Sequence, residues 1–138
     1  MLKQRLIHPE ILDALAAAGH GAKVLITDGN YPASTTIGEN AALIYLNLAP
    51  GKVTVTEVLE TLLTAIPVED AAVMEPDTGI EPAVFAEFRR QMPDLALTAY
   101  SRFEFYEEAG GPDICLQIVT GDQRLYANLL LTIGVVVS

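Results

Sequence analysis

Apolar residues recur along this chain in short blocks, and the spacing inside each block predicts either a strand or a helix. Compact apolar runs of strand length alternate with stretches in which apolar residues return every three or four positions. Turn-forming Gly, Pro, Asn and Asp residues separate most of the blocks. The expected strands are residues 23–27, 41–46, 71–74, 97–101, 114–119 and 129–137.

The helical blocks carry their own start and stop signals. Proline suits the first turn of a helix, and the spacing from Thr54 to Glu57 is that of a capping box. Glycine or proline follows each apolar stripe and marks its end. The expected helices run from Pro9 to Gly19, from Thr54 to Pro67 and from Pro82 to near Pro93, with one or two further turns at residues 102–109.

Strands that alternate with helices predict a single α/β domain over residues 1–138, with a mostly parallel central sheet flanked by helices. No linker-like stretch or abrupt change in composition divides the chain. In sheets of this kind, ligands bind beyond the carboxyl ends of the strands. The loops that follow Thr27, Ser101 and Val119 are therefore expected to gather around a ligand site.

Composition and charge narrow the class of partner. Apolar residues make up 51% of the 138 positions, which favours a globular domain. The formal net charge of −10 repels nucleic-acid phosphates and anionic membrane surfaces, so neither is an expected partner. No apolar run is long enough to span a bilayer and no secretory signal is visible, so we expect a cytoplasmic protein. The single cysteine, Cys115, excludes an internal disulfide and is expected to be a small core residue rather than a nucleophile.

His20 is the first candidate for acid–base chemistry. Histidine ordinarily changes its charge between about pH 5 and 8, and His20 lies between Gly19 and Gly21, which let the backbone present it to a cleft. A histidine near the C-terminus of a helix is also favoured by the helix dipole alone. Asp28 follows the next strand, where a carboxylate can orient an imidazole, bind a ligand hydroxyl or simply form a turn. The other histidine, His8, is expected to be a solvated loop residue.

Further candidates lie in the last third of the chain. Arg102 precedes the aromatic-rich residues 103–106, a combination that suits a polyhydroxyl ligand but equally a surface ion pair beside core rings. Tyr126 and Asn128 open the last strand with side chains that both donate and accept hydrogen bonds. No histidine or cysteine pair has metal-ligand spacing, and no glycine-rich phosphate loop follows the first strand. We expect neither a metal nor a cofactor.

Five short segments keep a common order and spacing across essentially the whole chain. They are Gly19-His20-Gly21, Asp28-Gly29-Asn30-Tyr31-Pro32, Arg102-Phe103-Glu104-Phe105-Tyr106, Thr120-Gly121 and Tyr126-Ala127-Asn128. Together they resemble the D-ribose pyranase and L-fucose mutarotase family. The resemblance implies a cofactor-free isomerase that exchanges the ring anomers of a free monosaccharide. It implies a catalytic proton donor at His20 and sugar contacts from Asp28, Arg102, Tyr126, Ala127 and Asn128.

The resemblance is to the fucose branch in particular, because arginine stands at position 102 where the ribose branch tends to carry histidine. We therefore expect L-fucose as the substrate. D-ribose pyranase activity, a non-catalytic monosaccharide-binding protein and a purely structural subunit are the alternatives. The resemblance also implies a homo-oligomer, such as a decamer, with sugar sites near subunit borders. The high apolar content leaves surplus surface for such interfaces.

Overall fold

The computed structural model describes residues 1–138 and contains six strands and five helices. Each expected strand is present, and residues 102–109 form a complete helix. A short helix at residues 33–36 was not expected. The elements in chain order are α1 Pro9–Ala17, β1 Lys23–Thr27, α2 Ala33–Thr36, β2 Ala42–Tyr45, α3 Val55–Leu62, β3 Val68–Met74, α4 Ala83–Gln91, β4 Leu97–Tyr100, α5 Arg102–Ala109, β5 Ile114–Val119 and β6 Leu129–Ile133.

All six strands belong to one sheet with the order β2-β5-β1-β6-β3-β4. The pairs β2–β5, β5–β1 and β3–β4 are parallel, whereas β6 runs antiparallel to both of its neighbours, β1 and β3. The sheet is thus mixed but mostly parallel, and the expected α/β class is confirmed. Because β6 alone is reversed, the carboxyl ends of the other five strands share one edge with the beginning of β6.

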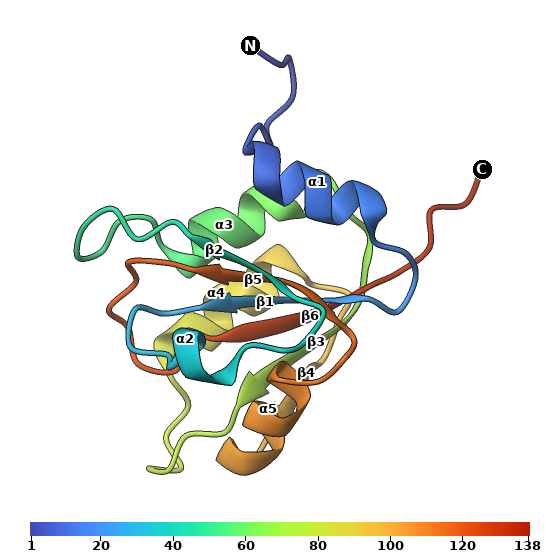
Figure 1. The fold of residues 1–138 in the computed structure, drawn as a ribbon. Helices are drawn as coiled ribbons and strands as arrows, with labels where there is room; N and C mark the ends of the chain where they lie inside the picture. The colour runs from blue at the N-terminus through green and yellow to red at the C-terminus, as the bar shows by residue number, and fades with distance from the viewer.

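The helices cover both faces of the sheet (Figure 1). Residues of α1, α3 and α4 pack with alternate residues of the strands into the larger apolar core, which includes the fully buried Leu59, Phe88 and Leu116. Residues of α2 and α5 form a smaller core on the other face, around Leu25 and Phe105. Alternation of strand side chains between the two cores explains why both faces of these strands are apolar.

Local signals explain where the helices begin. Thr54 accepts a hydrogen bond from the backbone N–H of Glu57 at 3.2 Å, and the Glu57 carboxylate accepts one from the N–H of Thr54 at 2.8 Å. This reciprocal pair is the expected capping box. Pro9 occupies the first turn of α1 as expected, but the prediction for His8 was wrong. Its Nδ1 accepts a hydrogen bond from the N–H of Ile11 at 3.3 Å, so His8 is the N-cap of α1.

The ends of several elements differ from the expectation, and β3 begins at Val68 rather than at residue 71. The last strand ends at Ile133. The N–H of Gly134 still bonds to the carbonyl of Pro67 at 2.9 Å, and the chain then leaves the sheet. The side chains of Val136 and Val137 are more than 80% exposed. Helix α3 ends at Leu62, and turns rather than helix lead from there to Pro67. No helix is long and apolar enough to cross a membrane.

Candidate active site

A hollow of about 300 Å³ opens at the carboxyl edge of the sheet. This volume lies at the lower end of the range of about 300–1,000 Å³ that is usual for small-molecule sites. The segments that follow β1, β3 and β4 meet there with the segment that leads into β6, as the parallel strands require. The lining residues are Asp28, Asn30, Tyr31, Met74, Arg102, Tyr106, Leu125, Tyr126 and Asn128.

A buried carboxylate and amide form the floor of the hollow. Asn128 Nδ2 donates to Asp28 Oδ2 at 3.1 Å, and Asn128 Oδ1 accepts from the backbone N–H of Asp28 at 3.0 Å. The N–H of Asn30 donates to Asp28 Oδ1 at 2.9 Å. Burial raises the pKa of the Asp28 carboxyl above its ordinary value, although these hydrogen bonds oppose the shift. Asp28 is therefore a fixed acceptor, held so that a ligand hydroxyl can donate to it.

Tyr126 adopts a backbone conformation that is rare for its residue type. Its φ is 62°, in the left-handed region, and it is the only non-glycine residue of the chain with a positive φ. An aromatic residue pays a steric cost there, and such outliers gather at functional sites. The Tyr126 hydroxyl accepts a hydrogen bond from the N–H of Asp77 at 3.1 Å. Its own proton remains available to a ligand in the hollow.

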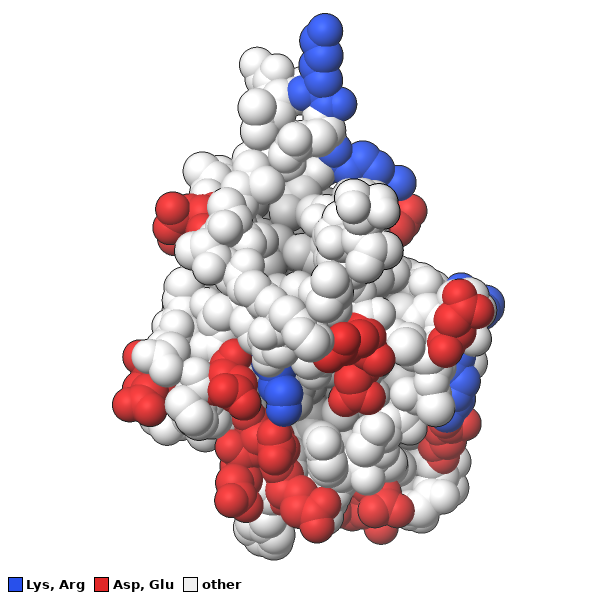
Figure 2. Space-filling view, turned by 90° about the vertical axis from the view of Figure 1, so that its right-hand side faces the viewer, with Lys and Arg blue, Asp and Glu red and all other residues white.

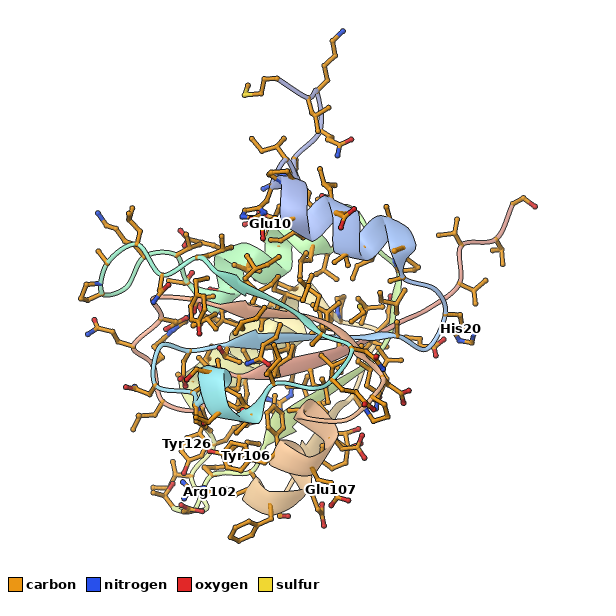
Figure 3. All side chains as sticks on the ribbon, in the orientation of Figure 1. Glu10, His20, Arg102, Tyr106, Glu107 and Tyr126 are labelled. Carbon is orange, nitrogen blue, oxygen red and sulfur yellow. The ribbon has the colours of Figure 1, made fainter.

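Arg102 is placed by the start of α5. Ser101 caps this helix by accepting from the N–H of Glu104 at 3.3 Å, and Arg102 is the first helical residue. Its Nη2 lies 3.3 Å from Asp77 Oδ2, so Asp77 contacts both Arg102 and Tyr126. The Arg102 side chain is about half exposed, which leaves other N–H groups free to bind hydroxyls. Figure 3 shows Arg102, Tyr106 and Tyr126 together at this end of the molecule.

Two further tyrosines, Tyr31 and Tyr106, complete the wall; both stand in segments that carry the family resemblance, but neither was expected as a site residue. The rings of Tyr31 and Tyr106 are 5.6 Å apart, and Tyr31 also packs edge-on against Phe105. The Tyr31 hydroxyl is buried and has no hydrogen-bond partner. Burial raises its pKa to about 12, so Tyr31 stays a neutral phenol. An unpartnered buried hydroxyl beside a polar hollow is a free donor for a ligand.

Ala127 lies between two lining residues but does not line the hollow itself. Its side chain is fully buried in the larger apolar core. Tyr126 and Asn128 lie on either side of it and both line the hollow. Ala127 therefore acts as a packing anchor for the segment that carries them.

His20 lies at the opposite edge of the sheet from this hollow. His20 precedes β1, whereas Asp28 follows this strand. The five residues of β1 rise by about 3.3 Å each, so the two side chains are separated by roughly 16 Å. Figure 3 shows His20 beside the C-terminal segment, far from Arg102. The expectation that Asp28 could orient the imidazole of His20 is therefore wrong within one chain. Both Glu69 carboxylate oxygens lie 3.0 Å from His20 Nε2 instead.

The loop between β5 and β6 is held by an ion pair that the sequence analysis also missed. Asp122 is 2% exposed and accepts from the N–H of Val55 at 3.0 Å. Arg124 donates to it from the backbone N–H and Nε at 3.0 Å each, and from Nη2 at 2.7 Å. Burial disfavours the Asp122 charge, but the bonds from Arg124 outweigh it and hold the pKa below its ordinary value. This pair fixes the loop that carries Tyr126 and Asn128.

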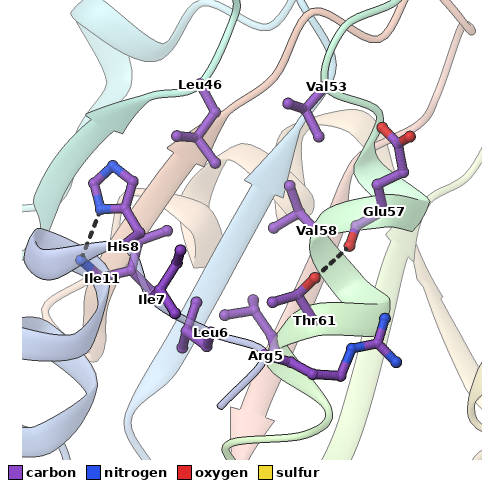
Figure 4. Close-up of a pocket in the computed structure, with 11 residues that line it drawn as sticks. Arg5, Leu6, Ile7, His8, Ile11, Leu46, Val53, Glu57, Val58 and Thr61 are labelled. Atoms are coloured by element: carbon purple, nitrogen blue, oxygen red, sulfur yellow. Dashed lines mark hydrogen bonds between the residues drawn. The ribbon is translucent and has the colours of Figure 1, made fainter. Parts of the chain in front are cut away.

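Other hollows are present, and one of about 380 Å³ also has a largely polar lining, which includes Asn30, Asn47 and Gln123. One of about 220 Å³ lies between the N-terminal segment and α3 (Figure 4) and is lined mainly by aliphatic side chains. Two of its polar groups are already paired, since His8 Nδ1 caps α1 and the Thr61 hydroxyl donates to the carbonyl of Glu57 at 3.0 Å. No group of three or more His, Cys, Asp or Glu side chains is placed to hold a metal ion.

The fold and the hollow define a small α/β protein whose site presents a carboxylate, an amide, a guanidinium and phenols to a compact polar ligand. The chain belongs to the RbsD / FucU transport protein family, whose model matches residues 1–136. It is 33% identical to the human fucose mutarotase over 94% of this chain and 90% of that protein. It is 27% identical to the D-ribose pyranase of Clostridium novyi (strain NT) over 99% of each.

A solved structure supports the same assignment. The fucose mutarotase from Streptococcus pneumoniae, in complex with L-fucose, superposes with a TM-score of 0.85 at 26% identity and covers 99% of this chain and 100% of its own. The relatives named above are isomerases that interconvert sugar anomers. The expected family, fold and enzyme class are thereby confirmed.

Proposed function

We propose that this chain is a monosaccharide mutarotase that interconverts the ring anomers of L-fucose. The observation that carries the proposal is the hollow itself, in which Asp28, Tyr126 and Asn128 present fixed acceptors and donors to one small volume. Paired donors and acceptors suit vicinal hydroxyls, and the ring of Tyr106 supplies an apolar surface for a sugar face. A cytoplasmic location fits a substrate of this kind.

The reaction needs a group that can both give and take a proton. Opening the ring breaks the bond between C1 and the ring oxygen, which takes up a proton while the anomeric hydroxyl loses one. Rotation about C1–C2 and closure then restore the hemiacetal with the opposite configuration. We assign the proton transfers to His20, because an imidazole has one nitrogen that can give a proton and one that can take it. Asp28, Arg102, Tyr126 and Asn128 hold the hydroxyls, and Ala127 holds the backbone between the last two.

The distance between His20 and the hollow requires a second chain. Within one chain they lie at opposite edges of the sheet, so we propose a homo-oligomer, such as a decamer, in which His20 of one subunit reaches the hollow of a neighbour. Large apolar residues remain exposed, as an interface needs: Leu125, which lines the hollow, at 69%, Phe103, which follows Arg102 in the chain, at 82%, and Ile80 at 75%. Closed symmetric assemblies are the usual way to bury such surface.

L-fucose is preferred over D-ribose because arginine stands at position 102, as in the fucose branch of the family that the chain resembles. D-ribose pyranase activity is the closest alternative. A non-catalytic monosaccharide-binding protein is a second candidate, because the hollow of a single chain contains no histidine.

Saturation-transfer NMR on L-fucose and D-ribose separates these functions. A mutarotase transfers saturation between the two anomeric proton signals faster than buffer alone, whereas a binding protein broadens the signals without faster exchange. The faster of the two sugars identifies the substrate. Removing the proton carrier with His20→Ala should slow exchange by about 100- to 10,000-fold. Sugar binding without accelerated exchange would establish the binding protein and refute the mutarotase.

A further inference from the structure

A second polar hollow lies beside the sugar hollow on the carboxyl edge of the sheet. Its volume is about 380 Å³, against about 300 Å³ for the first hollow, and Asn30 lines both. The parallel strands β2, β5 and β1 are neighbours, so the loops that follow them meet at this edge. These loops contribute residues 47–50, 120–123 and 29–30 to the lining, and Figure 1 shows them together at one end of the strands. The second hollow therefore continues the first along the same edge.

Backbone contacts fix the shape of the second hollow. The N–H of Gly29 donates to the carbonyl of Asp122 at 2.9 Å, and the N–H of Gly51 donates to the carbonyl of Gly121 at 2.6 Å. The loops touch so closely that a Cβ atom on Gly121 would lie 2.2 Å from the carbonyl oxygen of Lys52. Because each loop is bonded to the next, the hollow has its shape before any ligand enters, which favours binding.

Three carboxamide side chains line this hollow, one from each loop. They belong to Asn30, Asn47 and Gln123. All three residues are exposed, and their amide groups make no hydrogen bond within the chain. A carboxamide both donates and accepts hydrogen bonds, as a sugar hydroxyl does. The hollow thus offers unpaired donors and acceptors from three directions.

The charge of the lining favours a neutral ligand. Asp122 is the only charged residue that lines the hollow; it is 2% exposed, and its carboxylate accepts from Arg124 Nη2 at 2.7 Å. No lysine or arginine lines the hollow, so an anion would find no counter-charge there. Acidic side chains gather instead on the opposite side of the molecule, which carries the C-terminal segment (Figure 2). A neutral group rich in hydroxyls fits this lining best.

We propose that the second hollow is a subsite for a further sugar unit, so that the chain accepts a reducing disaccharide whose reducing unit occupies the first hollow. Ring opening needs only a free hydroxyl at C1, so a unit joined through another hydroxyl does not block it. Asn30 borders both hollows and can contact both units. This inference rests on the proposed mutarotase function, because it places the reacting unit in the first hollow.

Calorimetric titration of the full-length protein tests the subsite. The ligands are L-fucose and the three disaccharides that carry D-galactose on O2, O3 or O4 of L-fucose. Each net hydrogen bond tightens binding by about 2- to 10-fold, so at least one disaccharide should bind about 10-fold more tightly than L-fucose.

Two single variants connect this gain to the second hollow. Asn47→Ala and Gln123→Ala should each raise the Kd of that disaccharide by about 2- to 10-fold and leave the Kd of L-fucose unchanged. Both side chains are exposed and unpaired, so neither change should unfold the chain. Asn40→Ala is the matched control: it removes an exposed amide that lines neither hollow, and both Kd values should stay as in the wild type.

NMR anomer exchange separates failure of the subsite from failure of the function. The subsite is overturned if L-fucose exchanges rapidly but no disaccharide binds more tightly, or if the gain persists in Asn47→Ala/Gln123→Ala. Free D-galactose that binds beside L-fucose through the same two amides would overturn the disaccharide and indicate a separate monosaccharide site. A wild type that accelerates exchange of none of these sugars overturns the mutarotase function, whereas the dependence of Kd on the two amides is measured independently of exchange.

Discussion

Replacing Asp122 by asparagine should destabilise the protein strongly, although the change adds no bulk. The carboxylate accepts from the N–H of Val55 and from three N–H groups of Arg124. An amide keeps one acceptor oxygen and turns a donor toward the others, so about two charge-assisted bonds are lost at roughly 1.5–3 kcal/mol each. The Arg124 side chain is 37% exposed, so water replaces part of the lost hydrogen bonding. The free energy of unfolding should therefore fall by about 2–4 kcal/mol.

Urea denaturation at fixed protein concentration measures this loss. With an m value of about 2 kcal/mol/M, the midpoint should fall by about 1–2 M. The pH dependence adds a second test. Because the pKa of Asp122 is lowered in the folded state, its stabilising effect is present above the unfolded-state pKa of about 3.9 and is lost as the pH falls through the folded value. The stability difference between wild type and Asp122→Asn should therefore narrow in acid.

Asp28 provides a control of opposite sign. Burial raises its pKa in the folded state, so its ionisation opposes folding, and this penalty is relieved as the pH falls. The stability of the wild type relative to Asp28→Asn should therefore increase in acid. An Asp122→Asn protein with an unchanged midpoint at pH 7, or a difference that widens on acidification, would refute the role given to the Asp122 carboxylate.

Three further substitutions test the site and the loop around it. Arg102→Ala should raise the Kd for L-fucose by about 10-fold or more with little change in stability, measured by calorimetric titration; a collapse in Tm with unchanged Kd would show a structural role. Asn128→Asp sets a second carboxylate against Asp28, so denaturation midpoints should fall at pH 7 and recover toward pH 4, and a pH-independent loss would contradict this. Gly121→Ala should lower the free energy of unfolding by about 3 kcal/mol or more, because its Cβ would overlap the backbone carbonyls of Lys52 and Ala49. Gly19→Ala is the control, since open space surrounds Gly19, and equal melting curves for the two variants would contradict the close approach at Gly121.

Local patterns in the sequence predicted the elements whose causes are local. Lys23–Thr27 forms a strand between two cores, and the capping box at Thr54 opens α3. The last strand was expected to continue to Val137 but ends at Ile133. The residues that follow are apolar, yet no neighbouring strand extends far enough to pair with them, and composition alone does not reveal this. Helix α2 was missed because a single turn over Ala33–Thr36 has too few residues for any periodicity.

The sequence predicted the part of the site that lies where the carboxyl ends of the strands gather. It did not predict the part whose placement depends on the order of the strands in the sheet. The loops after β1 and β4 were expected to meet, and Asp28 and Arg102 do line one hollow. His20 lies only eight positions before Asp28, yet one strand carries it to the other edge of the sheet. The contact with Glu69 joins residues 49 positions apart across an intervening strand, and no sequence spacing encodes that.

Subunit mixing tests the central claim most directly. A His20→Ala chain and an Asn128→Ala chain are each inactive by this account, because each assembly lacks one half of every site. Refolded together in equal amounts, about a quarter of the interfaces should pair an intact His20 with an intact hollow on a neighbour. NMR anomer exchange of L-fucose should then recover to about a quarter of the wild-type rate. A mixture that stays as slow as its two separate components would contradict a mutarotase site shared between chains.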